Sequence, residues 1–270
     1  MKKALFFIAA VALALSFAPA AISAEEIRVG VLEPMSGKAA KSGQETVEGI
    51  KLAFDIINGK YDIDLPFART EGLPRKGGAK LKLILEDHGG RPERGRAIAE
   101  RMITQEKVHI LQGAFFSSVA APSSQVAEKY GIPYLTGESE SPALTERGLK
   151  VFFSVTPTAN DIARDFFTFL RDTSKAKGVS LNHVAVIHVN DNWGTGLAKA
   201  ARKIYKNYGY TKLSNIAYSP DVADLKSEVL QLKKIRPDVL LQASFDADAI
   251  LAVRSYQALR FSPTAVLAMG

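Results

Sequence analysis

Short apolar runs alternate with amphipathic segments along almost all of the chain after residue 25. The clearest runs, rich in branched side chains, span 27–32, 81–85, 108–111, 184–189 and 239–241. Each run is followed by a loop and then by apolar residues spaced three or four positions apart, as on one face of a helix. Val47, Ile50, Phe54 and Ile57 are an example. Apolar strands that are joined by crossover helices form parallel sheets covered on both faces. We therefore predict an α/β fold with parallel sheets flanked by helices.

The spacing of these units predicts two similar lobes. Strand–helix units begin near residues 27, 81, 108, 132, 184, 212, 238 and 265. A strand-like segment at 151–155 leads into Thr156-Pro157, which is a candidate hinge between a first lobe (25–156) and a second (157–270). The first helix is predicted to begin at Ser42, with Glu45 completing a capping box, and to end at Asn58. Residues 58–78 form a Gly-, Pro- and charge-rich insertion, expected at the surface.

The N-terminal residues have the pattern of a secretory signal peptide. Lys2 and Lys3 precede an apolar run at 4–17, and small residues follow up to Ala24. We expect residues 1–24 to be removed after Ala24. After that point no run approaches the roughly 18 apolar residues that a membrane span requires. The chain has no cysteine, which excludes disulfides and thiolate chemistry, and export without cysteine favours the bacterial periplasm.

Motifs for enzymes and cofactors are incomplete. The 190–196 segment follows a strand and opens a helix, but Lys199 replaces the third glycine of a dinucleotide fingerprint. The glycine-rich segment 72–80 does not have the Lys and Ser/Thr pair that a P-loop requires. No Gly-x-Ser-x-Gly motif of a serine hydrolase occurs, and the four histidines do not have the spacing of paired metal ligands. The 35 basic residues are dispersed among 28 acidic ones. We predict no enzyme activity, no cofactor, no metal and no nucleic acid partner.

Loops at the carboxyl ends of parallel strands are the places where such folds bind ligands. Here they span 33–42, 87–91, 113–118, 136–141, 190–196 and 244–248. Ser117 and Ser118 are expected to begin a helix, where free amides favour an anion, although simple helix capping is the alternative. Trp193, the only tryptophan, is placed in a polar loop, either as a stacking platform for a ligand or as a packing residue.

Several segments together resemble a known family. The first two are 27–31 with the following Pro34-Met35-Ser36-Gly37, and the first predicted helix at 43–58. The others are the segment 113–118, the pair 131–133 and 141–145, the segment 193–196, and the segment 232–238. In this order and spacing the chain resembles the substrate-binding proteins of branched-chain amino acid type ABC transporters, which are type I periplasmic binding proteins.

The resemblance implies two hinge-connected, Rossmann-like lobes that close over a small ligand such as an amino acid, an amide or an aromatic acid. It further implies a monomer in the periplasm that uses no cofactor and delivers its ligand to ABC permease subunits. A ligand-sensing subunit of a signalling receptor on the same fold is the alternative. A periplasmic enzyme on this scaffold is a third possibility.

The resemblance also assigns ligand-binding residues. These are Ser117, Ser118, Ser139, Glu140, Trp193, Phe245 and Asp246. The sequence departs from the family at Glu138-Ser139-Glu140, where small residues and a threonine are usual. If Glu140 faces the cleft, it would repel a ligand carboxylate and favour an amine or an amide donor. Ser42 stands where some relatives have a cleft aromatic. Family members continue beyond Gly270, so the second lobe is expected to be incomplete and the ligand stays unnamed.

Overall fold

The fold is described from a computed structural model, which places residues 26–269. The predicted signal peptide, 1–24, lies outside the described residues. Two compact units are present in the described part of the chain. One comprises residues 28–53 and 82–269, and the other comprises 54–81 together with 26–27. The lobe boundaries drawn from the sequence remain a prediction.

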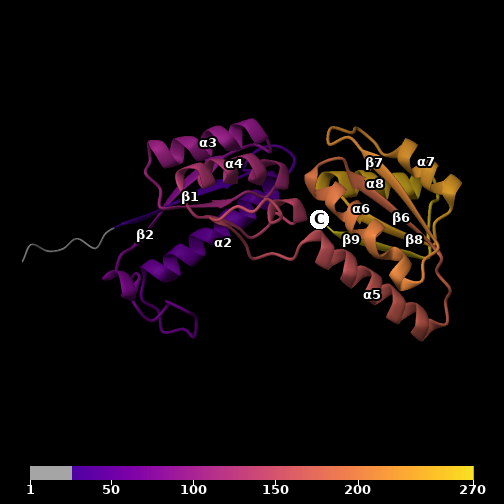
Figure 1. The fold of residues 1–270 in the computed structure, drawn as a ribbon, viewed down its shortest axis with the longest axis horizontal. Coiled ribbons are helices and arrows are strands. Elements are labelled where there is room, and N and C mark those ends of the chain that lie inside the picture. The colour runs from indigo at the N-terminus through magenta and orange to yellow at the C-terminus, as the bar shows by residue number, and fades with distance from the viewer. Residues whose placement is uncertain (1–25, 270) are drawn as a thin grey trace, which may run out of the picture. The chain divides into compact units, whose positions relative to one another are not determined.

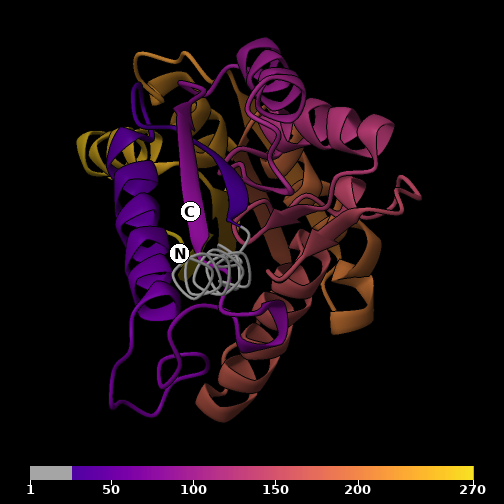
Figure 2. The ribbon, with the colours of Figure 1, turned by 90° about the vertical axis from the view of Figure 1, so that its left-hand side faces the viewer.

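The first sheet has five strands in the order β2-β1-β3-β4-β5. They are β1 (Ile27–Glu33), β2 (Leu81–Asp87), β3 (Ile110–Gly113), β4 (Tyr134–Thr136) and β5 (Phe152–Ser154). The β1–β3, β3–β4 and β4–β5 ladders are parallel. Helix α2 (Ala40–Asn58) lies on one face of this sheet, and α3 (Pro92–Thr104) and α4 (Ser117–Tyr130) lie on the other (Figures 1 and 2). The core between this sheet and helices α3 and α4 includes Leu32, Met102, Leu111 and Tyr134, which are fully buried.

The second sheet has four parallel strands in the order β7-β6-β8-β9. They are β6 (His183–Val189), β7 (Lys212–Tyr218), β8 (Val239–Ala243) and β9 (Ala265–Met269). Every residue of β6 and of β8 is buried, as expected for central strands covered on both faces. The helices are α5 (Ala159–Lys177), α6 (Asn192–Ile204), α7 (Lys226–Ile235) and α8 (Asp246–Ala258); α5 packs on α6 and α7 on α8. The predicted α/β fold is therefore confirmed.

The strand order of each sheet reverses at one point. In the first sheet the chain leaves β1 in one direction to reach β2 and returns in the other to reach β3. In the second sheet the equivalent reversal separates β7 from β8 on the two sides of β6. The connections leave a crevice at such a point, outside the carboxyl ends of the strands, and ligands bind there in open α/β sheets. The loops after β1, β3, β6 and β8 are therefore the first places to look for a site.

The smaller unit consists largely of irregular chain. Its only helical turn outside α2, in the described residues, is a 3₁₀ turn at Pro74–Lys76. Asn58 holds the two ends of the segment together, because its side chain donates to the Leu81 carbonyl at 2.8 Å and accepts from the Leu81 amide at 2.7 Å. This agrees with the predicted insertion at 58–78, whose Ile63, Leu65 and Phe67 side chains are exposed.

One local prediction needs correction. Helix α2 begins at Ala40, so Ser42 lies inside the helix and cannot form the predicted capping box with Glu45. The Ser42 hydroxyl instead donates to Asp246 Oδ2 at 2.9 Å. The candidate hinge strand contributes β5, which pairs with β4 in the first sheet. Further 3₁₀ turns occur at Pro142–Leu144 and Tyr205–Tyr208.

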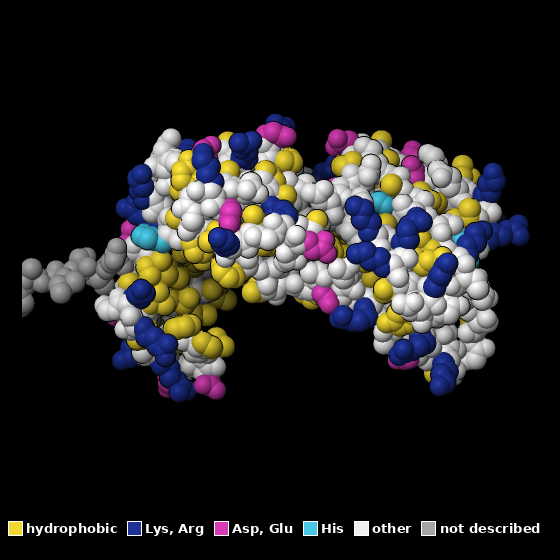
Figure 3. All heavy atoms as spheres, in the orientation of Figure 1, with side chains coloured by type: hydrophobic (Ala, Val, Ile, Leu, Met, Phe, Trp, Pro, Cys, Tyr) yellow, Lys and Arg dark blue, Asp and Glu magenta, His cyan; other side chains and the backbone are white. Residues whose placement is uncertain are grey.

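The surface in view carries charges of both signs. Lys and Arg side chains are scattered over it with Asp and Glu between them (Figure 3). Within residues 26–269, no helix is long and apolar enough to cross a membrane.

Candidate ligand-binding site

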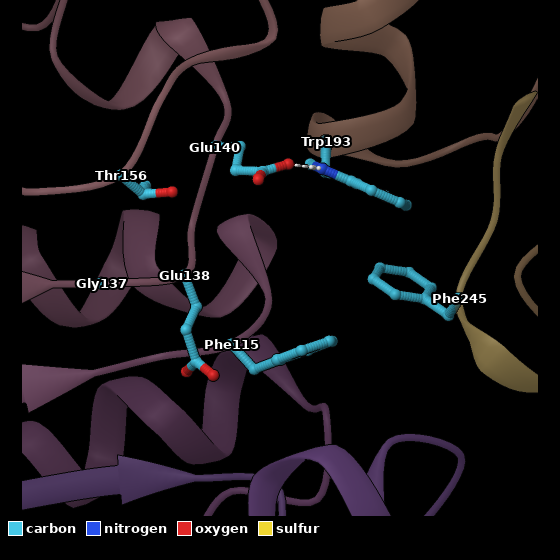
Figure 4. A pocket seen from close by; sticks show the side chains of 7 residues that line it. All are labelled: Phe115, Gly137, Glu138, Glu140, Thr156, Trp193 and Phe245. Carbon is cyan, nitrogen blue, oxygen red and sulfur yellow. Dashed lines mark hydrogen bonds between the residues drawn. The ribbon is translucent and has the colours of Figure 1, made fainter. Parts of the chain in front are cut away.

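A cavity of about 260 Å³ lies where loops from both sheets meet within the larger unit. Its walls come from the loops that follow β3, β4 and β5 in the first sheet and β6 and β8 in the second. Figure 4 shows its lining residues: Phe115, Gly137, Glu138, Glu140, Thr156, Trp193 and Phe245. Three of these side chains are aromatic and two are carboxylic acids. The site therefore combines an apolar wall with acidic groups.

Phe115 reaches the cavity because the backbone turns sharply at the end of β3. Gly113 has a φ of +132°, which side chains rarely allow, and a Cβ there would overlap with the Leu32 carbonyl oxygen. The Phe115 amide then donates to Glu33 Oε2 at 3.1 Å. Helix α4 begins two residues later, at Ser117, as the sequence predicted.

Trp193 is placed by the start of α6. The Asp191 side chain caps this helix by accepting from the Gly194 amide at 2.8 Å. A Cβ at residue 194 would overlap with the Val189 carbonyl oxygen, so glycine lets the helix approach the end of β6 closely. The prediction of a polar loop for Trp193 is wrong: the indole lies in the first helical turn and is only 5% exposed. Its Nε1 donates to Glu140 Oε2 at 2.8 Å (Figure 4).

Phe245 joins the aromatic wall from the residue before α8. Its ring stacks on Trp193, with centroids 4.7 Å apart and planes at 24°. Its ring also contacts the Phe116 ring edge-on, with centroids 4.8 Å apart, and lies 5.8 Å from the Phe115 ring, again between centroids. Aromatic pairs at these distances add to the stability gained by burial alone. The wall is therefore a continuous cluster that links the loops after β3, β6 and β8.

The loop after β4 alternates between anchoring and lining residues. Ser139 is buried, donates from its hydroxyl to the Ala114 carbonyl at 2.5 Å and from its amide to Thr136 Oγ1 at 3.1 Å. The Ser141 amide donates to Ser117 Oγ at 3.3 Å. Between these anchors, Glu138 and Glu140 face the cavity.

The carboxyl groups at this loop have perturbed acidity. Burial raises the pKa of Glu140, and the hydrogen bond from Trp193 opposes that rise. Burial also raises the pKa of Glu138, whose Oε1 accepts from Thr46 Oγ1 at 2.5 Å. Glu33, at the end of β1, is completely buried; this burial and then the neighbouring Glu138 raise its pKa to about 9. Glu33 is therefore protonated at neutral pH.

The residues predicted from the sequence divide into three groups. Glu140, Trp193 and Phe245 line the cavity together. Ser117 and Ser139 are buried and hold backbone groups. Neither Ser118 nor Asp246 is among the lining residues, and Asp246 accepts a hydrogen bond from Ser42.

Sequence reasoning did not select Phe115, Glu138, Thr156 or the buried Glu33. Phe115 and Glu138 lie in loops at strand ends that were named as candidate ligand-binding loops. The sequence signal for both residues is therefore their position just after a predicted strand. Glu33 was marked in the same way, as the first residue of its loop. Residues 26–269 contain no cluster of three or more His, Asp or Glu side chains that could hold a metal ion.

This fold and cavity define a class of protein: an α/β protein with a small cavity at the carboxyl ends of strands from two parallel sheets. The model of a family described as periplasmic binding protein matches residues 26–270. The chain belongs to this family. The resemblance seen in the sequence is thereby confirmed.

The similar proteins are binding proteins. The Leu/Ile/Val-binding protein homolog 7 of Brucella abortus is 29% identical over all of this chain, which covers 64% of that protein. A leucine-binding protein of Thermotoga maritima superimposes with a TM-score of 0.76 at 20% identity, covering 90% of this chain and 63% of that one. A solute-binding protein of Rhodopseudomonas palustris, solved in complex with benzoate, also superimposes with a TM-score of 0.76, at 18% identity. The match covers 91% of this chain and 62% of that one. The chain thus spans less than two thirds of the length of these relatives.

Proposed function

We propose that this chain forms the ligand-binding part of a periplasmic receptor that captures a small polar molecule and passes it to an ABC permease. The observation that carries the proposal is the cavity at the carboxyl ends of strands from both sheets, walled by aromatic rings and carboxyl groups. Parallel α/β sheets bind ligands at this position. Family membership supports transport as the purpose of the binding.

Capture is proposed to use closure of the two predicted lobes. Residues before and after position 157 both contribute to the cavity, and pairs such as Trp193 with Glu140 and Ser42 with Asp246 connect them. A ligand that touches both sets of residues binds the closed arrangement more tightly than an open one. It therefore shifts the protein toward closure, and the permease can recognise the closed form.

A thermal-shift screen of the full-length protein tests this proposal. Amino acids, amides, polyamines and aromatic acids are the first ligands to try, since the similar proteins carry Leu/Ile/Val in their names or benzoate in their structures. A ligand at a hundred times its dissociation constant adds about 2.7 kcal/mol to the unfolding free energy. For a protein of this size that is a rise in Tm of several degrees. If a cooperatively melting protein responds to none of them, binding of this kind is contradicted.

Trp193 offers a second readout because it is the only tryptophan in the chain. The indole is already buried and bonded to Glu140, so a ligand should change its emission by altering that contact rather than by removing water. We expect a change in fluorescence that saturates with the ligand concentration, and no such signal in Trp193→Phe. Binding detected by calorimetry with unchanged emission would show that Trp193 does not take part in the site.

A further inference from the structure

The cavity has an unusual charge balance. Glu138 and Glu140 both face it, whereas no Lys or Arg is among its described lining residues. No ion pair with a basic side chain reaches either carboxyl group in the described part of the chain; their partners are Thr46, Glu33 and Trp193. Asp248 differs, because Lys38 Nζ lies 4.0 Å from its Oδ1. A partly buried carboxylate without a cation is unfavourable, so this site has a deficit of positive charge.

Glu33 gives independent evidence for the same deficit. Its side chain is completely buried, and its Oε1 has no hydrogen-bond donor within the described residues. The Glu138 carboxyl is the neighbour with which it can share a proton. The protein thus stores a proton beneath the cavity rather than a second negative charge. A ligand carboxylate placed above it would add another negative charge to a site that is already acidic.

The aromatic wall suits a positive ligand as well. The faces of aromatic rings attract cations through their quadrupoles, and tryptophan does so most strongly. Trp193 and Phe245 form a stacked pair beside Glu140, and the Phe115 ring, which points toward Phe245, adds a third ring to the wall (Figure 4). Rings and carboxylates around one small cavity are the groups that recognise an organic ammonium ion.

We propose that the ligand of this site is a small organic cation, an amine or a quaternary ammonium ion without a free carboxylate. This inference rests on the proposed receptor function and names its substrate class. Glu140 and Glu138 supply the counter-charges, while Trp193, Phe115 and Phe245 enclose the apolar part. The ligand completes the charge balance that the described side chains leave open.

Three probes of one shape separate charge from size: benzylammonium, benzyl alcohol and benzoate. Calorimetric titration of the full-length protein should show benzylammonium binding at least about tenfold tighter than the alcohol, with benzoate weakest. Choline and its neutral analogue 3,3-dimethylbutanol form a second pair for a quaternary ion. The order cation, neutral, anion is the expected result in each set.

Substitutions of the two cavity glutamates test whether their carboxyl groups cause the preference for a cation. Glu140→Gln keeps an acceptor for Trp193 but removes the charge, and should weaken benzylammonium by about tenfold or more while leaving benzyl alcohol nearly unchanged. Glu138→Gln provides a second test should the first variant fold poorly. Glu45→Gln, an exposed carboxyl on α2 beside Lys41, is the matched control and should have no effect.

The outcomes distinguish this inference from the proposed function. Tighter binding of benzoate or isoleucine than of any cation would overturn the cation preference and leave the receptor function standing. Cation binding that is unchanged in both Gln variants would also overturn it. If none of these probes binds and no ligand of the wider thermal-shift panel raises Tm, both proposals are contradicted.

Discussion

Replacing Glu33 with glutamine should change how the stability of the protein depends on pH. Glu33 is completely buried at the end of β1, and burial followed by the neighbouring Glu138 raises its pKa from 4.5 to about 9. Glutamine has the same shape, can accept from the Phe115 amide as Glu33 Oε2 does, and can donate to Glu138. The variant therefore mimics the protonated acid at every pH.

The raised pKa determines the sign of the effect. An acid with a raised pKa in the folded state contributes stability that is fully present below its unfolded-state pKa, near 4.5, and is lost as the pH rises toward 9. The loss is about 1.4 kcal/mol per pH unit for one proton. From about pH 5 to about pH 8, the wild-type protein should therefore lose about 4 kcal/mol relative to Glu33→Gln. Burial of Glu138, which raises its pKa too, acts in the same direction.

Urea unfolding, followed by far-UV circular dichroism across this pH range, measures the difference. The two proteins should have similar stability near pH 5 and diverge steadily above it, with the variant more stable. Glu45→Gln, which changes an exposed carboxyl on α2, should follow the wild-type curve. Parallel curves for the wild type and Glu33→Gln would refute the reasoning, because they would show that Glu33 ionises with an ordinary pKa.

Two further variants test how the site is held. Ser117→Ala should lower the unfolding free energy by about 1 kcal/mol, because the buried Ser141 amide loses its acceptor, while ligand affinity in calorimetry stays nearly constant; a large loss of affinity with normal stability would instead place the hydroxyl on the ligand. Asp191→Ala should cost about 1 kcal/mol by uncapping α6, and Asp191→Asn should restore most of it. Equal urea midpoints for the wild type and Asp191→Ala would show that the cap contributes nothing.

Much of the fold could be predicted because the central strands are covered on both faces. The apolar runs at 184–189 and 239–241 match β6 and β8, whose residues are all buried. Boundaries were less certain. Ser42 was predicted as a helix cap from its type and from Glu45, but its hydroxyl bonds to Asp246, far away in the sequence. A local pattern carries no information about such a partner.

The candidate site was predictable as a set of loops but not as a set of side chains. Parallel sheets bring the carboxyl ends of their strands to one edge, so the loops containing Phe115, Glu140 and Phe245 were candidates, and all three residues line the cavity. The direction of each side chain depends on backbone turns and tertiary hydrogen bonds. Ser139 turns inward to the Ala114 carbonyl, and Glu33 meets Glu138 only after the sheet has formed. Neither contact leaves a trace in residue type or spacing.

The alternation in the loop after β4 separates two requirements that often conflict. Ser139 and Ser141 hold the backbone, whereas Glu138 and Glu140 carry the charges that face the cavity. Substitutions at the second pair can therefore alter selectivity while the scaffold keeps its anchors. Substitutions that keep an acceptor for Thr46 at position 138 and for Trp193 Nε1 at position 140 should be the least costly to folding. In evolution, the same arrangement would let the proposed site change its ligand preference through two positions while the buried serine anchors stay as they are.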